Sequence, residues 1–151
     1  MTPREPYSYR ADPDVPPFPD DRPLIVFDGM CVFCSRFAQL VLRRDRRRVF
    51  RMTTVQSPLG IALCRHYGLD PTDPVSSLLI ENGRLYPKSA GGLRIFARLC
   101  FPWSLLAVGR VLPRAIADWL YDRVALNRIA WFGARETCLM PDPADAGRFL
   151  A

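Results

Sequence analysis

Three things are scarce in this chain of 151 residues: histidine, lysine and long apolar runs. His66 is the only histidine, which leaves few ligands for a metal site, and Lys88 is the only lysine among 21 basic residues. No run approaches the roughly 20 apolar residues that span a bilayer. The most apolar segment, residues 99–112, is interrupted by Pro102 and Arg110. We therefore expect no membrane span.

The amino-terminal residues carry charges among prolines and contain no apolar core of a secretory signal. The five cysteines are an odd number for a disulfide framework. Both features favour a reducing compartment, and we expect the protein to be cytoplasmic.

The net charge of +6 raises the question of nucleic-acid binding. The densest basic cluster, residues 43–48, falls at the end of a predicted helix, where cations complement the helix dipole. No aromatic residues alternate with these arginines, as they would on a surface that stacks single-stranded bases. We interpret the cluster as a solvated helix end and expect no nucleic-acid partner.

The chain begins with a proline-rich stretch. Residues 1–22 hold six prolines and little to bury, so we expect a flexible arm, extended or disordered. Residues 23–151 are long enough for one domain with its own core. Short apolar runs there predict strands at residues 23–27, 49–55, 75–80 and 84–86. Asn82-Gly83 predicts a hairpin turn between the last two strands.

Helix signals lie between these strands and after them. Apolar residues recur at helical spacing from Cys31 onward, at Cys34, Phe37, Ala38 and Val41. The further predicted helices are Ser57–Tyr67, one capped by Ser89 that runs to about residue 100, and mostly helical stretches at 102–113 and 114–132. The order of elements predicts an α/β fold with a thioredoxin-like mixed sheet flanked by helices, and extra C-terminal helices.

The sequence Cys31-Val32-Phe33-Cys34 places two cysteines at the expected start of a helix. Unpaired N–H groups and the positive end of the dipole favour the thiolate there, and the thiolate is the nucleophile. The spacing of three residues brings the second sulfur within reach of a disulfide. Cys31 precedes the buried stripe, so we expect it to lie exposed at the mouth of the site and to attack. Cys34 belongs to the stripe and would resolve the mixed disulfide.

Two other interpretations of the pair stay open. Structural zinc uses the same C-x-x-C spacing but needs two further ligands, for which Cys64 and His66 are the nearby candidates. These two lie about 200° apart around a helix and cannot easily face one ion, and His66 is expected to be a half-exposed helix residue. The other interpretation is two buried cysteines without chemistry. We also expect no chemistry from Cys64, Cys100 and Cys138, of which Cys64 and Cys100 look like core positions.

The motif Asp28-x-x-Cys31-x-x-Cys34 resembles that of the DCC family of thiol–disulfide oxidoreductases (the DUF393 domain). The similarity runs from about residue 22 to the end of the chain. Its later blocks are Gln56-Ser57, the segment around 76–93, Asn127-Arg128, Trp131-Phe132-Gly133, Cys138 and the closing Arg148-Phe149-Leu150.

The resemblance implies a thioredoxin-like redox protein in which Cys31, Cys34 and Asp28 are the catalytic residues. Thioredoxins carry a cis-proline just before the strand that faces their cysteine pair, and Ser76 stands near that place here. Ser76, Lys88 and Ser89 are the candidate substrate-binding residues.

We expect a protein or small-molecule thiol or disulfide as substrate, with reducing equivalents supplied by another protein or a small thiol. No metal or organic cofactor is implied. The alternative is a non-catalytic thioredoxin-like module that docks a partner through its basic face or its C-terminal helices.

Overall fold

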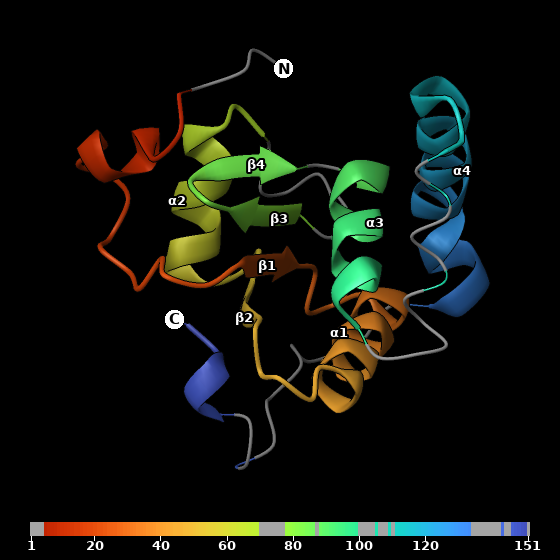
Figure 1. Ribbon diagram of the computed structural model, residues 1–151, viewed down its shortest axis with the longest axis horizontal. Coiled ribbons are helices and arrows are strands. Elements are labelled where there is room, and N and C mark those ends of the chain that lie inside the picture. The colour runs from red at the N-terminus through yellow and green to blue at the C-terminus, as the bar shows by residue number, and fades with distance from the viewer. Residues whose placement is uncertain are drawn as a thin grey trace.

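Four strands form one mixed sheet in the middle of the molecule, with helices on both of its faces (Figure 1). The computed structural model describes residues 5–69, 78–86, 88–99, 105, 109, 111–133, 143 and 146–150. The strands are β1 (Leu24–Phe27), β2 (Arg51–Thr54), β3 (Leu78–Glu81) and β4 (Arg84–Tyr86). Their order across the sheet is β2-β1-β3-β4.

The strand directions follow from the connections. β1 and β2 run parallel because α1 (Val32–Arg44) carries the chain back between them, whereas β3 is antiparallel to both β1 and β4. Asn82 and Gly83 have φ angles of 51° and 75°, the left-handed values that a two-residue hairpin turn requires. The predicted hairpin and the thioredoxin-like mixed sheet flanked by helices are confirmed.

The three later helices are α2 (Pro58–His66), α3 (Lys88–Arg98) and α4 (Arg114–Phe132). Ser57 caps α2 as predicted, because its Oγ accepts a hydrogen bond of 3.0 Å from the N–H of Gly60. α3 begins at Lys88, one residue before the serine that we expected to cap it, so Ser89 lies in the first turn. Most of the predicted helix at 102–113 falls outside the described residues.

Successive residues of a strand point to opposite faces of the sheet. Both sets of side chains are buried, because helices cover both faces. One core packs α1 and α3 against the sheet; its members include Ile25, Phe27, Cys34, Val41, Met52, Leu79 and Ile95. The other core lies under α2; its members include Leu24, Val26, Leu59, Leu63, Cys64, Leu78 and Ile80. Gly60 lets α2 approach β2 closely, since a Cβ there would stand 2.0 Å from the carbonyl oxygen of Thr54.

Residues 5–22 contribute to the second core, so the expectation that the proline-rich segment has little to bury was wrong. Tyr9, in the short 3-10 helix Ser8–Ala11, is 3% exposed and Val15 is 7% exposed. The N–H of Tyr7 donates to the carbonyl of Gly83 at 2.9 Å. The segment therefore contacts the β3–β4 turn at Gly83. The division of the chain at residue 22 stays a prediction.

His66 holds the same segment, and its predicted half-exposed position was wrong. The side chain is 3% exposed, with Nδ1 lying 2.6 Å from Asp12 Oδ2 and Nε2 lying 2.8 Å from Ser8 Oγ. Both ring nitrogens therefore contact the amino-terminal segment. The segment shields the histidine from solvent, and no feature of α2 alone could indicate this.

The far end of the chain returns to the sheet beside β2. Phe149 forms a parallel bridge with Met52, and the N–H of Leu150 donates to the carbonyl of Met52 at 2.8 Å. Just before this bridge, Arg148 forms a buried ion pair with Asp45 and donates to the carbonyl of Phe50.

Asp45 explains why β2 is shorter than predicted. Its carboxylate accepts hydrogen bonds from the N–H groups of Val49 and Phe50 at 3.1 and 2.9 Å. These two residues therefore belong to the α1–β2 loop, and the strand begins at Arg51. The arginines on either side of Asp45 are exposed, in agreement with the predicted solvated helix end.

We expect Arg148→Met to lower the free energy of unfolding by about 3 kcal/mol, because it leaves the buried Asp45 carboxylate without its cation. Urea denaturation measures the change. Arg36→Met, at an exposed position on α1, is the control and should cost less than about 0.5 kcal/mol. Equal midpoints for the two variants would contradict this role of the ion pair.

Candidate active site

The turn between β1 and α1 sets up the cysteine pair. β1 is buried along its whole length and passes directly into Asp28. The N–H of Met30 donates to Asp28 Oδ1 at 3.0 Å, and the N–H of Cys31 donates to the carbonyl of Asp28 at 3.3 Å. These bonds turn the chain within three residues and place Cys31 at the N-cap of α1.

Cys31 is the N-cap of α1, with φ of −86° and ψ of 125°. Its carbonyl accepts the first helical hydrogen bond from Ser35, and its Sγ accepts the N–H of Cys34 at 3.5 Å. The second cysteine therefore lies one turn along the helix, close to the first. An N–H group aimed at sulfur stabilises negative charge there.

Both cysteines are buried, at 0% exposure for Cys31 and 1% for Cys34. The expectation that Cys31 lies exposed at the mouth of the site was therefore wrong. Beside the pair, the carbonyl of Gly133 accepts the N–H of Val32 at 3.4 Å. Gly133 directly follows α4, so the end of α4 contacts the amino terminus of α1. Elements far along the chain bury Cys31, and the local sequence pattern could not indicate it.

Asp28 is 6% exposed and is held by the loop that follows β2. Gln56 Nε2 donates to Asp28 Oδ1 at 2.7 Å, and Gln56 Oε1 accepts the N–H of Gly29 at 3.1 Å. Ser35 Oγ donates to the carbonyl of Gly29 at 3.2 Å. The turn is thus bonded to β2 and to α1 as well as to itself.

Gln56 and Ser35 were not among the site residues predicted from the sequence. A signal for Gln56 was present: β1 and β2 are parallel, so the residues that follow them meet at the same edge of the sheet. Phe27 pairs with Thr54 in the register, so Asp28 and Gln56 follow their strands by one and two residues and lie at the same edge.

Cys64 lies in the second core, as expected of a residue without chemistry. Burial raises the pKa of its thiol from 9.0 to about 11, so the thiol stays protonated at neutral pH. Within the described ranges, no three side chains among His, Cys, Asp and Glu are grouped as metal ligands.

The structure brings Asp28, Cys31 and Cys34 together but tells less about the other predicted site residues. Ser76, Cys100 and Cys138 lie outside the described residues. Lys88 and Ser89 lie in the first turn of α3. Their roles in substrate binding stay predictions.

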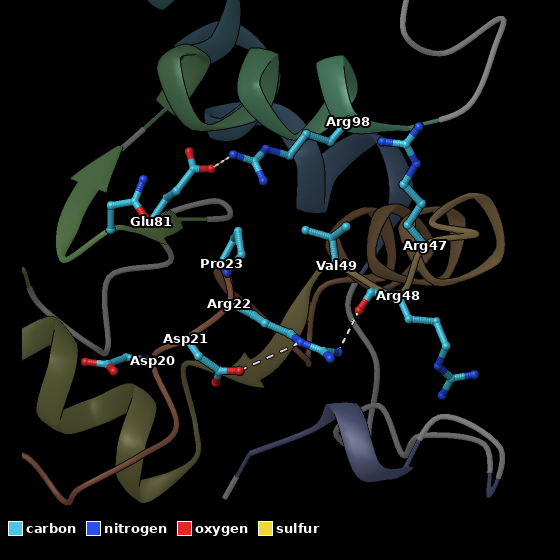
Figure 2. Close-up of a pocket in the computed structure, with 10 residues that line it drawn as sticks. Asp20, Asp21, Arg22, Pro23, Arg47, Arg48, Val49, Glu81 and Arg98 are labelled. Carbon is cyan, nitrogen blue, oxygen red and sulfur yellow. Dashed lines mark hydrogen bonds and ion pairs between the residues drawn. The ribbon is translucent and has the colours of Figure 1, made fainter.

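A cleft lined largely by charged residues lies at the opposite end of β1, beside Pro23 (Figure 2). Its buried carboxylate, Glu81, forms ion pairs with Arg94 at 3.3 Å and with Arg98. The guanidinium of Arg22 donates to the carbonyl of Arg48 at 3.0 Å, which ties the start of β1 to the α1–β2 loop. These contacts join neighbouring elements, and we interpret the cleft as structural.

A thioredoxin-like sheet with a C-x-x-C pair at the start of the helix that follows β1 is typical of thiol–disulfide oxidoreductases. Comparison with known families agrees. The family described as "DCC1-like thiol-disulfide oxidoreductase" matches residues 25–134, which include the cysteine pair and all of the described strands except Leu24, the first residue of β1. The chain belongs to this DCC family, and the resemblance found in the sequence is confirmed.

Two relatives cover most of the chain. The "Uncharacterized protein YuxK" of Bacillus subtilis is 35% identical over 128 residues, which are 84% of this chain and 93% of that protein. The "DCC family protein At1g52590, chloroplastic" of Arabidopsis thaliana is 38% identical over 120 residues, 79% of this chain and 70% of that protein. No solved structure matches. Across the described part of the chain, no helix has the length and apolar character to cross a bilayer.

We expect iodoacetamide at pH 7 to modify Cys31 before Cys64, because only the first sulfur lies at a helix amino terminus. Burial raises the pKa of the Cys64 thiol to about 11, so this thiol is protonated at pH 7 and should react slowly. Mass-spectrometric mapping of a time course measures the order. Modification of Cys64 first would contradict the assignment.

Proposed function

We propose that this protein is a thiol–disulfide oxidoreductase that acts through Cys31 and Cys34. The observation that carries the proposal is the pair's position: Cys31 caps α1, and its Sγ accepts the N–H of Cys34 at 3.5 Å. Membership of a family described as thiol–disulfide oxidoreductases supports the same chemistry.

The proposed reaction has two steps. The Cys31 thiolate attacks one sulfur of a substrate disulfide, forming a mixed disulfide and releasing the first substrate thiolate. Cys34 then loses its proton to a base and attacks the Cys31 sulfur, which releases the second thiolate. The substrate disulfide is reduced to two thiols, and the protein's two thiols are oxidised to one disulfide. In the reverse direction the protein donates its disulfide.

Burial of both sulfurs adds a requirement. A substrate disulfide reaches Cys31 only when the contacts at the start of α1 separate, and the hydrogen bond between Val32 and Gly133 lies there. We propose that exchange includes a local opening of this contact. Ser76, Lys88 and Ser89 are proposed contacts for the substrate once it has entered.

Asp28 is the proposed base for the second step. It is buried, directly precedes the turn that carries Cys31, and is held by bonds from Met30 and Gln56. A positioned carboxylate can take the proton that Cys34 must lose before it attacks.

The reaction needs a donor or acceptor of electrons but no bound organic cofactor. We propose that a second protein or a small thiol fills this role. The odd number of cysteines supports a reducing compartment, and we keep the cytoplasm as the proposed location.

A non-catalytic docking module is the second candidate, favoured by the outer side of α4. This helix lies beyond α3 and away from the sheet (Figure 1). Its exposed side carries large apolar residues, namely Ile116, Trp119, Leu120, Leu126 and Trp131. A docking module would bind its partner equally well without the sulfur atoms.

Trapping of mixed disulfides tests the proposed function. We expect Cys34→Ser to accumulate a mixed disulfide between Cys31 and glutathione after exposure to glutathione disulfide, because the resolving thiol is absent. Cys64→Ser is the matched control and should release the adduct as the unaltered protein does. Mass spectrometry of intact protein and peptides measures it. Absence of an adduct on Cys31 in Cys34→Ser would exclude the exchange reaction.

Asp28→Asn tests the base. The asparagine Oδ1 can accept the same two hydrogen bonds from Met30 and Gln56, so the turn should survive. We expect the first attack by Cys31 to be unchanged or faster. Release of the mixed disulfide should slow by about 100-fold, as is typical for loss of a general base. Stopped-flow measurement of both steps checks this; an unchanged second step would leave Asp28 as a turn residue only.

A further inference from the structure

We infer that Gln56 is a positioning residue for the Asp28 base. This inference rests on the proposed function, and it concerns the second step of the reaction, in which Cys34 gives up its proton. The evidence is a pair of hydrogen bonds from one side-chain amide to two neighbouring groups of the cysteine turn.

The two bonds fix the amide in a single orientation. Nε2 donates to the Asp28 carboxylate at 2.7 Å, and Oε1 accepts the N–H of Gly29 at 3.1 Å. A carboxylate oxygen cannot donate and a backbone N–H cannot accept, so a reversed amide would lose both bonds. Gln56 is thereby bonded to the Asp28 side chain and to the backbone of the turn at the same time.

The backbone places Gln56 firmly. The N–H of Val55 donates to the carbonyl of Phe27 at 2.8 Å, which extends the parallel pairing of β1 and β2 by one residue. Ser57, on the other side, is the cap of α2. The glutamine thus stands between a strand end and a helix start, and its side chain spans from an exposed position to the buried Asp28.

This geometry has a chemical consequence. A proton acceptor must be ionised and aimed when the thiol releases its proton. An amide N–H that donates to the carboxylate fixes the direction in which that oxygen points. Gln56 would therefore hold Asp28 Oδ1 in place during resolution, while leaving the first attack by Cys31 alone.

Gln56→Glu gives the sharpest test, since it keeps the acceptor for Gly29 but replaces the donor to Asp28 by a second carboxylate. The measured quantity is the rate at which the second glutathione leaves the mixed disulfide, divided by that of Gln39→Glu. The control adds the same charge to a half-buried position on α1.

We expect this ratio to be about 0.1 at pH 7.5, because one hydrogen bond to a charged group is lost. The ratio should rise toward 1 as the pH is lowered toward about 4, because a glutamic acid with an ordinary pKa of about 4.3 becomes protonated there and can donate again. A merely structural change would give a ratio that does not depend on pH in this way.

Gln56→Met, which removes both bonds but keeps the length, is the second variant. It should slow resolution at every pH without slowing the first attack, and it keeps the test decisive if Gln56→Glu fails to fold. A ratio near 1 at all pH values, with normal exchange by the unaltered protein, would overturn the role of Gln56 alone. If the unaltered protein forms no mixed disulfide at all, the proposed function itself fails.

Discussion

The polar groups of a turn that follows a buried strand need hydrogen-bond partners, and this requirement determines the geometry of the site. β1 runs into a turn whose carboxylate, N–H and carbonyl groups lie at the edge of the core. Gln56, Ser35 and the turn's own amides supply the missing partners. Because Gln56 follows β2 and Ser35 lies in α1, the turn has all of these partners only when β1, β2 and α1 are packed together.

The same arrangement links the cysteines to the rest of the chain. Cys31 caps α1 and belongs to the core beneath α1 and α3, and the end of α4 contacts the next residue. Under the proposed function, the reactivity of the pair would be coupled to the packing of α4. Because thiol exchange requires access to the sulfur, α4 would then influence the rate at which substrate enters.

Much of the fold could be predicted because its elements carry strong local signals. Ser57-Pro58 marked the start of α2, Asn82-Gly83 marked the hairpin, and helical spacing from Cys34 onward marked α1. The C-x-x-C motif likewise placed the cysteines at a helix start. What failed depended on contacts between distant segments. Nothing in the sequence near Cys31 indicates that the Gly133 carbonyl bonds to the N–H of Val32. Nothing near Tyr9 indicates that the Tyr9 side chain is buried in the core.

The central claim is that Cys31 and Cys34 form a reversible redox pair, and its most direct test is the reduction potential of that pair. The protein is equilibrated in buffers of defined glutathione or dithiothreitol ratio, and the disulfide is identified by mass spectrometry. The account predicts one two-electron transition that joins Cys31 to Cys34, at a potential between about −120 and −270 mV. Failure to form this disulfide, or a potential below about −300 mV as in structural disulfides, would contradict it.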